Sequence, residues 1–496
     1  MGSLVSSPKQ GDKTEDLMTL KDVQINLIVR SSQPSRGVLN METVNMSANE
    51  LDYVVIGVEV KSRELFSRLL LANEFLKRGV SVVIGQLPTA ERLSALGGKA
   101  YIFGKCGQKA FADRYRELVD QGWRLGAIDE EGLLPNDLAS FAELRFGDTS
   151  NRLLRDYFFF GEEQFNYFKR EFPDTGSFFL SGNPRVDLWK ARYHGYYDRA
   201  SNLLRSQLGR FWIFPLNLAY YTNQRLRSKA IAGAMGAEYA QLASRSEYIF
   251  DEYCKLSTHL RSEHGIITRF RPHPADSFKE VVSLLSKHGV AHAGSLTHAG
   301  GEVSPWLLAA EGMIHNCCTT AVEAAMMGVN VVSYTPKETS LYIDDEVNDF
   351  GVRAPSVLDA TGVVIGSGAK LEYPLVNKRL KSWKRLYVPP RQTSSELICE
   401  RIIRRTQIGS RSLRFRKLWR DEAIHRGKYI KAVLSSLMGS RERIVLHRKF
   451  ENTSTSEIRA KLHFLQSKTG TPLADVERVG PNLFAIHPRE NAKQGN

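Results

Sequence analysis

The sequence is poor in cysteine and contains no long apolar run. Its five cysteines are odd in number, are scattered along 496 residues and form no Cys-x-x-Cys pair, so neither a disulfide framework nor a zinc site is indicated. No uninterrupted apolar stretch approaches the ~20 residues that a membrane-spanning helix needs, and the N-terminus lacks the charged-then-apolar pattern of a signal peptide. We therefore expect a cytoplasmic protein with free thiols.

Acidic residues are scarce in one part of the chain. Residues 376–450 hold 21 Lys and Arg but 5 Asp and Glu, a net charge of +16, whereas the whole chain carries +14. At the centre of this segment, residues 411–420 mix cations with Phe, Leu and Trp, which is typical of a helix that lies on an anionic membrane. A nucleic-acid surface and a solvated helical face are the alternatives. We expect peripheral contact with the inner face of the cell membrane and no nucleic-acid partner.

Apolar runs and helical patterns alternate through most of the chain and predict two α/β domains. We interpret ten apolar runs as strands, in two series. The first series comprises residues 53–57, 80–85, 101–103, 124–128, 157–160 and 178–180. The second series comprises residues 211–216, 266–270, 312–315 and 329–334. Alternation with helices implies parallel, doubly wound sheets. Two Rossmann-like halves that face each other across a cleft form the GT-B architecture, which is the α/β fold class that we predict.

Composition also predicts the domain boundaries. We expect an irregular leader at 1–50, Rossmann-like domains at 51–190 and 205–375, and a basic, mainly helical C-terminal extension at 376–496. Polar residues around Asn183 and Arg185 close the first series, and we place the domain junction beside the cleft there.

Two polar loops follow strands of the second series. Residues 271–274, Arg-Pro-His-Pro, follow one predicted strand, and residues 316–320, Asn-Cys-Cys-Thr-Thr, follow another; a helical pattern succeeds each. In open α/β sheets, ligands bind at the carboxyl edge of the strands, where helix N-termini present free N–H groups. The two loops together therefore predict one anion site.

Each loop also has a structural interpretation. Thr319 and Thr320 place two hydroxyls beside helix amides, as a phosphate site requires, but Thr320 and Glu323 also have the spacing of a capping box. His273 stands between two prolines that stiffen it, although an isolated histidine is often a structural residue. The occurrence of both loops at one sheet edge favours a site.

An acidic loop follows a strand of the first series. Asp129, Glu130 and Glu131 are consecutive and precede a glycine. Three adjacent carboxylates repel one another, so at least one acquires a raised pKa that suits a general base. The alternative is a solvated acidic turn. If the two domains face each other, this loop opposes the anion site.

These motifs, in this order, resemble those of bacterial surface-carbohydrate biosynthesis proteins. The resemblance covers roughly residues 50–340, and its motifs are 58–61 with 63–65, 129–132, 182–187, 271–274 and 319–325. Three of them are similar to the acidic-acidic-Gly, His-Pro and paired-hydroxyl motifs of bacterial sialyltransferases and Kdo transferases, which use CMP-activated sugars. The resemblance implies a GT-B glycosyltransferase whose first domain binds the acceptor and whose second domain binds the nucleotide sugar.

The resemblance also implies roles for individual residues. It makes Glu130 the catalytic carboxylate, although the extra Asp129 and the adjacent Glu131 leave the identity of the base open. It places the nucleotide phosphate against His273, Thr319 and Thr320, where threonines replace the serine pair of the family. Glu302 is the candidate for the ribose hydroxyls. The remaining residues that we assign to nucleotide binding are Arg271, Pro274 and Glu323.

The predicted reaction is sugar transfer from a nucleotide-activated donor, most simply a CMP-sugar, to a glycan or lipid-linked acceptor. Preorganised donors such as His273 and the threonine hydroxyls meet the developing phosphate charge without a metal or cofactor, and the sequence contains no Asp-x-Asp motif. Three alternatives remain: a nucleotide-sugar 2-epimerase, a CDP-glycerol-type glycerophosphotransferase, and a non-catalytic nucleotide-sugar-binding or membrane scaffold protein.

Overall fold

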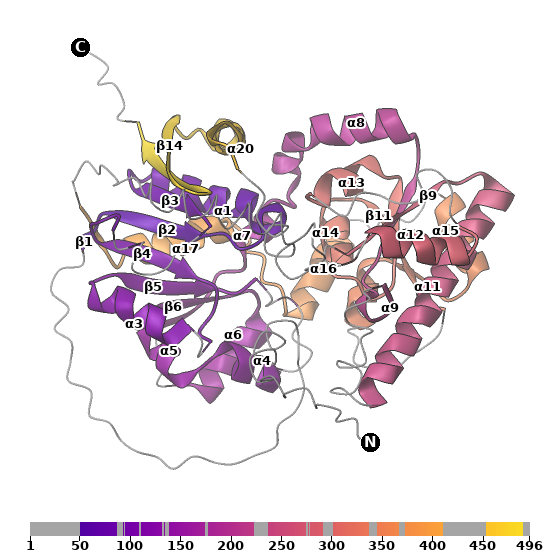
Figure 1. The fold of residues 1–496 in the computed structure, drawn as a ribbon, viewed down its shortest axis with the longest axis horizontal. Coiled ribbons are helices and arrows are strands. Elements are labelled where there is room, and N and C mark those ends of the chain that lie inside the picture. Colours follow the sequence, from indigo (N-terminus) through magenta and orange to yellow (C-terminus); the bar gives the residue numbers. More distant parts are fainter. Residues whose placement is uncertain are drawn as a thin grey trace, which may run out of the picture.

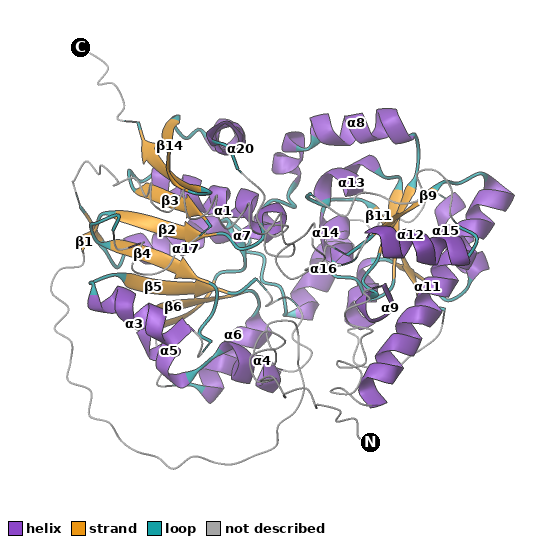
Figure 2. Ribbon diagram, in the orientation of Figure 1, coloured by secondary structure: helices purple, strands orange, loops and turns teal. Residues whose placement is uncertain are grey.

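The chain forms two α/β domains that lie side by side (Figure 1). The computed structural model describes residues 50–86, 93, 95–108, 111–130, 133, 138–173, 177–222, 237–273, 276, 278–290, 301–336, 345–366, 373–409 and 453–489. Within these ranges, helices cover both faces of each sheet (Figure 2). No helix in the described ranges is long and apolar enough to cross a membrane.

The first domain is built on an eight-stranded sheet with the order β14-β15-β3-β2-β4-β5-β6-β7. Its parallel strands are β2 (Tyr53–Gly57), β3 (Ser81–Gly85), β4 (Ala100–Gly104), β5 (Arg124–Ile128), β6 (Leu154–Phe159) and β7 (Ser177–Leu180). These strands are continuous apolar runs because helices bury both of their faces. The direction of winding changes between β2 and β4, so a crevice for ligands is expected at their carboxyl ends.

The helices of the first domain fall between these strands. They are α1 (Lys61–Leu76), α3 (Ala112–Asp120), α4 (Leu138–Arg145), α5 (Asp148–Leu153), α6 (Glu162–Glu171) and α7 (Pro184–Asp187). The helix α1 is almost entirely buried, since α17 (Ser394–Ile403) and α20 (Thr455–Thr469) pack on it. The 3-10 helix η3 (Ala191–Tyr196) and α8 (Asp198–Leu208) then lead to the second domain.

The second domain contains a five-stranded parallel sheet with the order β12-β11-β10-β8-β9. Its strands are β8 (Trp212–Pro215), β9 (Thr268–Arg271), β10 (Gly312–His315), β11 (Asn330–Tyr334) and β12 (Val352–Ala354). Its helices are α9 (Ala219–Thr222), α11 (Ala237–His264), α12 (Phe278–Lys287), α13 (Ser304–Ala309), α14 (Thr320–Met326), η4 (Asp345–Phe350), α15 (Val357–Ile365) and α16 (Tyr373–Trp383). The winding reverses between β8 and β10.

The last part of the chain returns to the first domain. Figure 1 shows the orange α17 and the yellow α20 among the indigo elements of that domain. The strands β14 (Ala474–Gly480) and β15 (Leu483–Pro488) form a hairpin, and β15 pairs antiparallel with β3. A second short pair joins β1 (Glu50–Leu51) to β13 (Gln407–Ile408). Two helices and two strands of the segment 376–496, which we expected to form a basic extension, thus pack on or pair with the first domain.

The two domains meet at the carboxyl ends of their sheets. After β6, the carbonyl of Phe160 accepts a hydrogen bond of 2.8 Å from the amide of Tyr387, which follows α16. After β7, Arg185 of α7 lies 3.7 Å from Glu323 of α14. One apolar cluster also joins Val186 to Val322. The predicted strands all occur, most within two residues of the expected bounds, and the GT-B-like α/β fold class is confirmed.

Candidate active site at the carboxyl edges of the two sheets

The acidic loop of the first domain is buried rather than solvated. Asp129 and Glu130 follow the last residue of β5 and are 4% and 6% exposed. Glu130 forms an ion pair of 2.8 Å with Nη2 of Arg68, a buried residue of α1. Asp129 lies 3.8 Å from Nε of Arg145. The alternative of a solvated acidic turn is therefore wrong for these two carboxylates, while Glu131 lies outside the described residues.

Glu130 is the least satisfied carboxylate of this loop. Neither of its oxygens accepts a hydrogen bond from the residues that the structure describes, despite the ion pair with Arg68. Buried polar atoms normally have a hydrogen-bond partner, and exceptions cluster at sites with chemical roles. Glu130 thus has the burial and the unused acceptor capacity that a proton-accepting group requires.

Three further charged residues surround the point where the winding of the first sheet reverses. Glu59 follows β2 and Lys105 follows β4, and their side chains are 2.6 Å apart. Glu64, in the first turn of α1, accepts a hydrogen bond of 2.7 Å from the amide of Glu59. Burial raises the pKa of Glu64, and the negative charge of Glu130 raises it further. None of these three residues was assigned a role from the sequence, although Glu59 and Glu64 fall in the first motif. The position of Glu59 and Lys105 after adjacent strands is the signal that would have identified these two.

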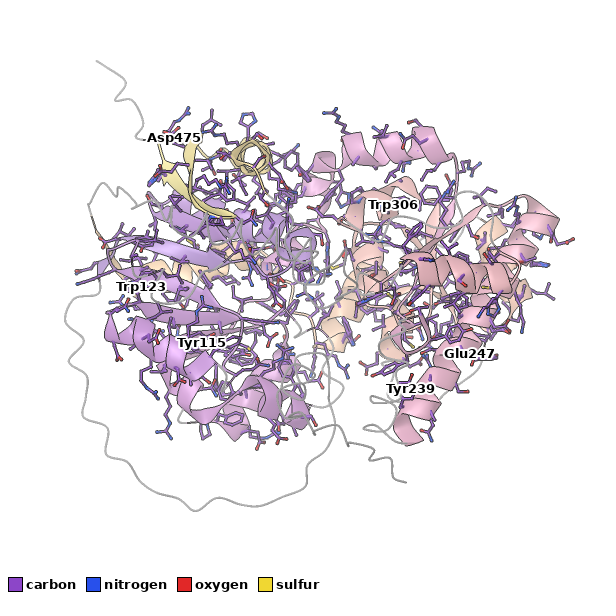
Figure 3. The ribbon with its side chains drawn as sticks, viewed as in Figure 1. Tyr115, Trp123, Tyr239, Glu247, Trp306 and Asp475 are labelled. Carbon is purple, nitrogen blue, oxygen red and sulfur yellow. The ribbon has the colours of Figure 1, made fainter. Side chains whose placement is uncertain are left out.

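In the second domain, a buried Arg and a buried Glu line the corresponding edge. Arg271, the last residue of β9, donates a hydrogen bond of 2.9 Å to the carbonyl of Gly301 and lies over the ring of Trp306 at 5.9 Å. Trp306 belongs to α13 of the second domain (Figure 3). Burial lowers its pKa to about 10, while the charge of Glu323 opposes this shift. Burial raises the pKa of Glu323, which Arg185 opposes. This edge is therefore a desolvated, polar environment.

The capping-box interpretation of the paired threonines is wrong. Thr319 precedes α14 but its side chain caps no amide, and Glu323 does not turn back to the helix N-terminus. Instead Glu323 accepts a hydrogen bond of 2.7 Å from Oγ of Ser304 on α13 and faces Arg185. Both threonines are half-buried at the edge of the sheet. The helix itself is short and spans Thr320–Met326.

A strained loop precedes the threonines at the point where the second sheet reverses its winding. Cys317 has a φ of 50°, a left-handed conformation that is uncommon without glycine. Asn217, which follows β8, donates to the carbonyls of Asn316 and Cys317 at 3.0 and 3.1 Å. Asn348 accepts a hydrogen bond of 2.8 Å from the amide of Cys317. Such strain is retained where the surroundings enforce it, often at functional sites.

His273 follows β9 and is exposed at the same edge. Its amide donates a hydrogen bond of 3.0 Å to Oδ2 of Asp276, which also accepts one of 3.0 Å from Thr222. Burial raises the pKa of Asp276 to about 6. The strands β9 and β10 flank β8, so His273 and the threonines lie at one edge, two strands apart. Pro274 lies outside the described residues.

Glu302 has a partner that the sequence did not suggest. Its carboxylate forms an ion pair of 2.8 Å with Lys461 of α20, a helix packed on the first domain. Lys461 is buried and its ammonium lies over the rings of Phe66 and Tyr196, at 5.0 and 4.7 Å. This ion pair is a further link between the domains. The ribose role of Glu302 stays a prediction.

Asn183 and Arg185 lie at the start of α7, and their role at the junction beside the cleft stays a prediction. The side chain of Asn183 is fully buried, and its Oδ1 accepts a hydrogen bond of 2.8 Å from the amide of Arg185 at the start of α7. The structure therefore brings together Arg185, Arg271 and Glu323. Among the described residues, no cluster of His, Cys, Asp and Glu is arranged to hold a metal ion, and metal independence stays a prediction.

Comparisons with known proteins identify similar structures but no family. No protein-family model matches the chain, and no curated protein matches its sequence. Similar solved structures include UDP-GlcNAc 2-epimerase from Methanocaldococcus jannaschii in complex with UDP-GlcNAc and UDP, with 12% identity and a TM-score of 0.43 over 71% of this chain and 99% of that chain. Wall teichoic acid polymerase TagF has 11% identity and a TM-score of 0.41, over 71% of this chain and 88% of the TagF chain. HepE from Anabaena, in complex with UDP and glucose, has 10% identity and a TM-score of 0.35, over 72% of this chain and 97% of the HepE chain.

Proposed function

We propose that the protein is a metal-independent GT-B glycosyltransferase of surface polysaccharide biosynthesis, which transfers a sugar from a nucleotide-activated donor to a glycan or lipid-linked acceptor. The observation that carries this proposal is Glu130, a buried carboxylate at the carboxyl edge of the first sheet with unused acceptor capacity. The carboxyl edge of the second sheet, where Glu323 meets Arg185 of the first domain, carries the candidate nucleotide residues.

The proposed chemistry is a displacement at the anomeric carbon. The acceptor hydroxyl gives its proton to Glu130 while its oxygen forms the new bond to that carbon, and the bond from the carbon to the nucleotide phosphate oxygen breaks. The bonding electrons leave with the phosphate. The ion pair with Arg68 holds the Glu130 carboxylate in place. This direct displacement inverts the anomeric configuration.

The departing phosphate requires positive or hydrogen-bonding groups. We assign this role to His273 and to the hydroxyls of Thr319 and Thr320, and the ribose hydroxyls to Glu302. In a desolvated site, such preorganised donors stabilise a developing charge more than water does. Arg271 and Glu323 hold α13, α14 and the end of β9 together at this edge. The assignment of the donor as a CMP-sugar rests on the motif resemblance.

Two other enzyme classes fit the same geometry in part. A nucleotide-sugar 2-epimerase needs acid–base groups beside the sugar but no second substrate. A CDP-glycerol-type glycerophosphotransferase would break a phosphoanhydride bond instead of the glycosidic one. A scaffold protein would bind donors without turnover. Product analysis separates these, because a transferase lengthens an acceptor and an epimerase does not.

The test is calorimetric titration of CMP, CDP and UDP into the full chain, paired with a transfer assay in the presence of EDTA. We expect CMP to bind tightest and turnover to persist in EDTA. A preference for UDP would overturn the donor assignment, and loss of activity in EDTA would overturn metal independence. Binding of every nucleotide without any turnover would instead support the scaffold class.

A further inference from the structure

A buried lysine of the first domain reaches the second domain at Glu302. Lys461 of α20 is 6% exposed, and its ammonium lies 2.8 Å from the Glu302 carboxylate. Lysine is rarely buried without a partner, because the ammonium loses its hydration. Burial alone lowers the pKa of Lys461, but Glu302 and Tyr196 outweigh this effect and the net shift is upward. The ammonium is therefore charged where it meets Glu302.

The helix α20 is fastened to α1 at both ends, which fixes the position of Lys461 between them. Near the start of α20, Glu457 forms an ion pair of 2.8 Å with Lys61. At the end of α20, the hydroxyl of Thr469 accepts a hydrogen bond of 2.9 Å from the side chain of Asn73. Figure 1 shows the yellow α20 beside the indigo α1. The helix α20 is thus a firmly held part of the first domain.

Two aromatic rings confine the ammonium of Lys461. Its Nζ lies 5.0 Å from the centroid of the Phe66 ring and 4.7 Å from that of the Tyr196 ring. Rings at such distances attract a cation, and burial restricts the rotamers of a long side chain. The ammonium is therefore held in one place, as a group that orients a carboxylate must be.

The main chain on both sides of Glu302 is anchored at the carboxyl edge of the second sheet, where the candidate nucleotide residues lie. The carbonyl of Gly301 accepts a hydrogen bond of 2.9 Å from Arg271, at the end of β9. Oγ of Ser304 donates a hydrogen bond of 2.7 Å to the buried carboxylate of α14. Lys461 engages Oε1 of Glu302, whose side chain is 20% exposed. The carboxylate thus stays accessible at this edge.

An ion pair that merely joins two domains does not require a buried lysine. Removal of an ammonium from water costs free energy that its partner must offset. The ion pair of Arg185 with Glu323 joins the same domains through a cation that remains 27% exposed. A carboxylate held in one orientation can accept hydrogen bonds from two neighbouring hydroxyls, and such fixed geometry favours recognition. The burial of Lys461 therefore fits orientation of Glu302 better than adhesion of the domains.

Given the proposed ribose role of Glu302, on which this inference rests, we propose that Lys461 is a positioning residue for nucleotide binding. It orients the Glu302 carboxylate so that this group accepts hydrogen bonds from the ribose hydroxyls of the donor. The helix α20 of the first domain is thereby part of the donor site of the second domain. The helix α1 carries both Phe66, beside the ammonium, and Arg68, which pairs with Glu130. One helix therefore supports groups on the donor side and on the acceptor side of the reaction.

The experiment compares the full-length wild type with Lys461→Met, which keeps most of the length of the side chain and removes its charge. The matched control is Lys468→Met, since Lys468 is exposed on the same helix and also lies over a ring, that of Phe464, at 5.5 Å. Calorimetry gives the affinities for CMP, CDP and UDP and for their 2′,3′-dideoxy counterparts. We expect Lys461→Met to bind the ribonucleotides about tenfold more weakly than the wild type and the dideoxy compounds equally well. Lys468→Met should match the wild type for both.

The ratio of the two affinities separates positioning from a structural role. A change at Lys461 that weakens ribonucleotides and dideoxy compounds alike, or neither of them, overturns the positioning role. Lys461→Arg keeps the positive charge and should retain more of the preference for ribonucleotides than Lys461→Met does. Should Lys461→Met not fold, Lys461→Gln replaces it with the same expected loss.

Failure of the proposed function gives a different result from failure of the positioning role. A wild type that binds no nucleotide overturns both. A wild type that prefers ribonucleotides, together with a Lys461→Met variant that has the same preference, overturns the positioning role alone.

Discussion

Nη2 of Arg185 lies 3.7 Å from Oε2 of Glu323, and this ion pair joins the two domains where the carboxyl ends of their sheets meet. Glu323 is 4% exposed at its side chain, and its second oxygen is held by Ser304. Arg185 is partly exposed and the distance is long, so the ion pair is weaker than a fully buried one. It positions α14 relative to α7.

Removal of the arginine should therefore destabilise the protein moderately. We expect Arg185→Gln to lower the free energy of unfolding by about 1–3 kcal/mol, because Glu323 keeps its charge in a buried place. In the Glu323→Gln background the same change should cost less, which a double-mutant cycle measures by urea unfolding. Arg199→Gln, an exposed arginine of α8, is the control. Strictly additive effects would show that the two side chains do not interact.

Glu130→Gln should reduce turnover and leave donor binding unchanged. A glutamine keeps the size of the side chain but cannot accept the proton, and general-base losses are typically ~10²–10⁴-fold in turnover. Steady-state kinetics give kcat and KM, while calorimetry gives the donor affinity. Glu143→Gln, an exposed glutamate on α4, is the matched control.

Two results would change this assignment. An unimpaired Glu130→Gln enzyme together with an impaired Asp129→Asn enzyme would move the base to the preceding residue. Loss of donor binding and of the folded state in Glu130→Gln would instead indicate that the residue serves mainly to balance the buried Arg68. Melting temperatures of all variants separate these outcomes.

Asp276 should make the protein less stable as the pH rises from about 4 to about 6. Burial raises its pKa to about 6 in the folded state, so the folded protein binds the proton more tightly than the unfolded chain does. The group therefore contributes its full stability below pH ~4 and loses this contribution as the pH rises to about 6, above which its effect no longer changes with pH. The loss in the free energy of unfolding over this pH range is up to about 3 kcal/mol.

Asp276→Asn removes the titration and retains an acceptor for Thr222 and for the amide of His273. We expect the free energy of unfolding of the variant, relative to that of the wild type, to rise between pH 4 and pH 6. Above pH 6 this difference should remain constant. Urea unfolding at several pH values measures it. A difference that is independent of pH would contradict the raised pKa.

The strands of both sheets were predictable because they are buried on two faces. Residues 53–56 and 81–84 are almost uninterrupted β-branched and apolar runs, and the polar loops that follow them mark the sheet edges. The strand β14 was missed because Ala474–Gly480 contains charged residues, as a strand at the sheet edge does. The strand β14 joins the first sheet through β15, which pairs with β3. The paired residues Leu483 and Gly85 are nearly 400 positions apart, and a local sequence pattern does not encode such a contact.

In the candidate site, too, the sequence predicted the positions of residues along the strands but not their partners. Sequence position placed Asp129, His273 and Thr319 correctly at strand ends, because parallel strands always deliver such loops to one edge. The partners of the site residues were not predictable. The ion pair between Glu302 and Lys461 forms only because the chain crosses back to the first domain, and the burial of Glu130 depends on α1.

The last prediction concerns the basic segment, whose centre at residues 411–420 lies outside the described residues. Within the described part, Arg385, Arg401 and Arg405 already form ion pairs with Glu163 and Asp156, so they contribute less to a membrane-binding surface than their charge suggests. The expected contact with anionic lipid therefore depends on residues 411–420. Each cation near an anionic membrane contributes about 1 kcal/mol, which salt screens.

Conversion of Arg411, Arg414, Arg416 and Lys417 to Ser should thus abolish most of the binding to anionic vesicles, by roughly fivefold for each cation removed. The control converts four exposed cations of the same segment, Lys378, Lys381, Arg391 and Arg404, to Ser and removes the same charge. Co-sedimentation with phosphatidylglycerol vesicles at two salt concentrations measures both. If the two quadruple variants lose binding equally, net charge alone accounts for it; if the wild type binds neutral and anionic vesicles alike, the electrostatic basis of the contact is wrong.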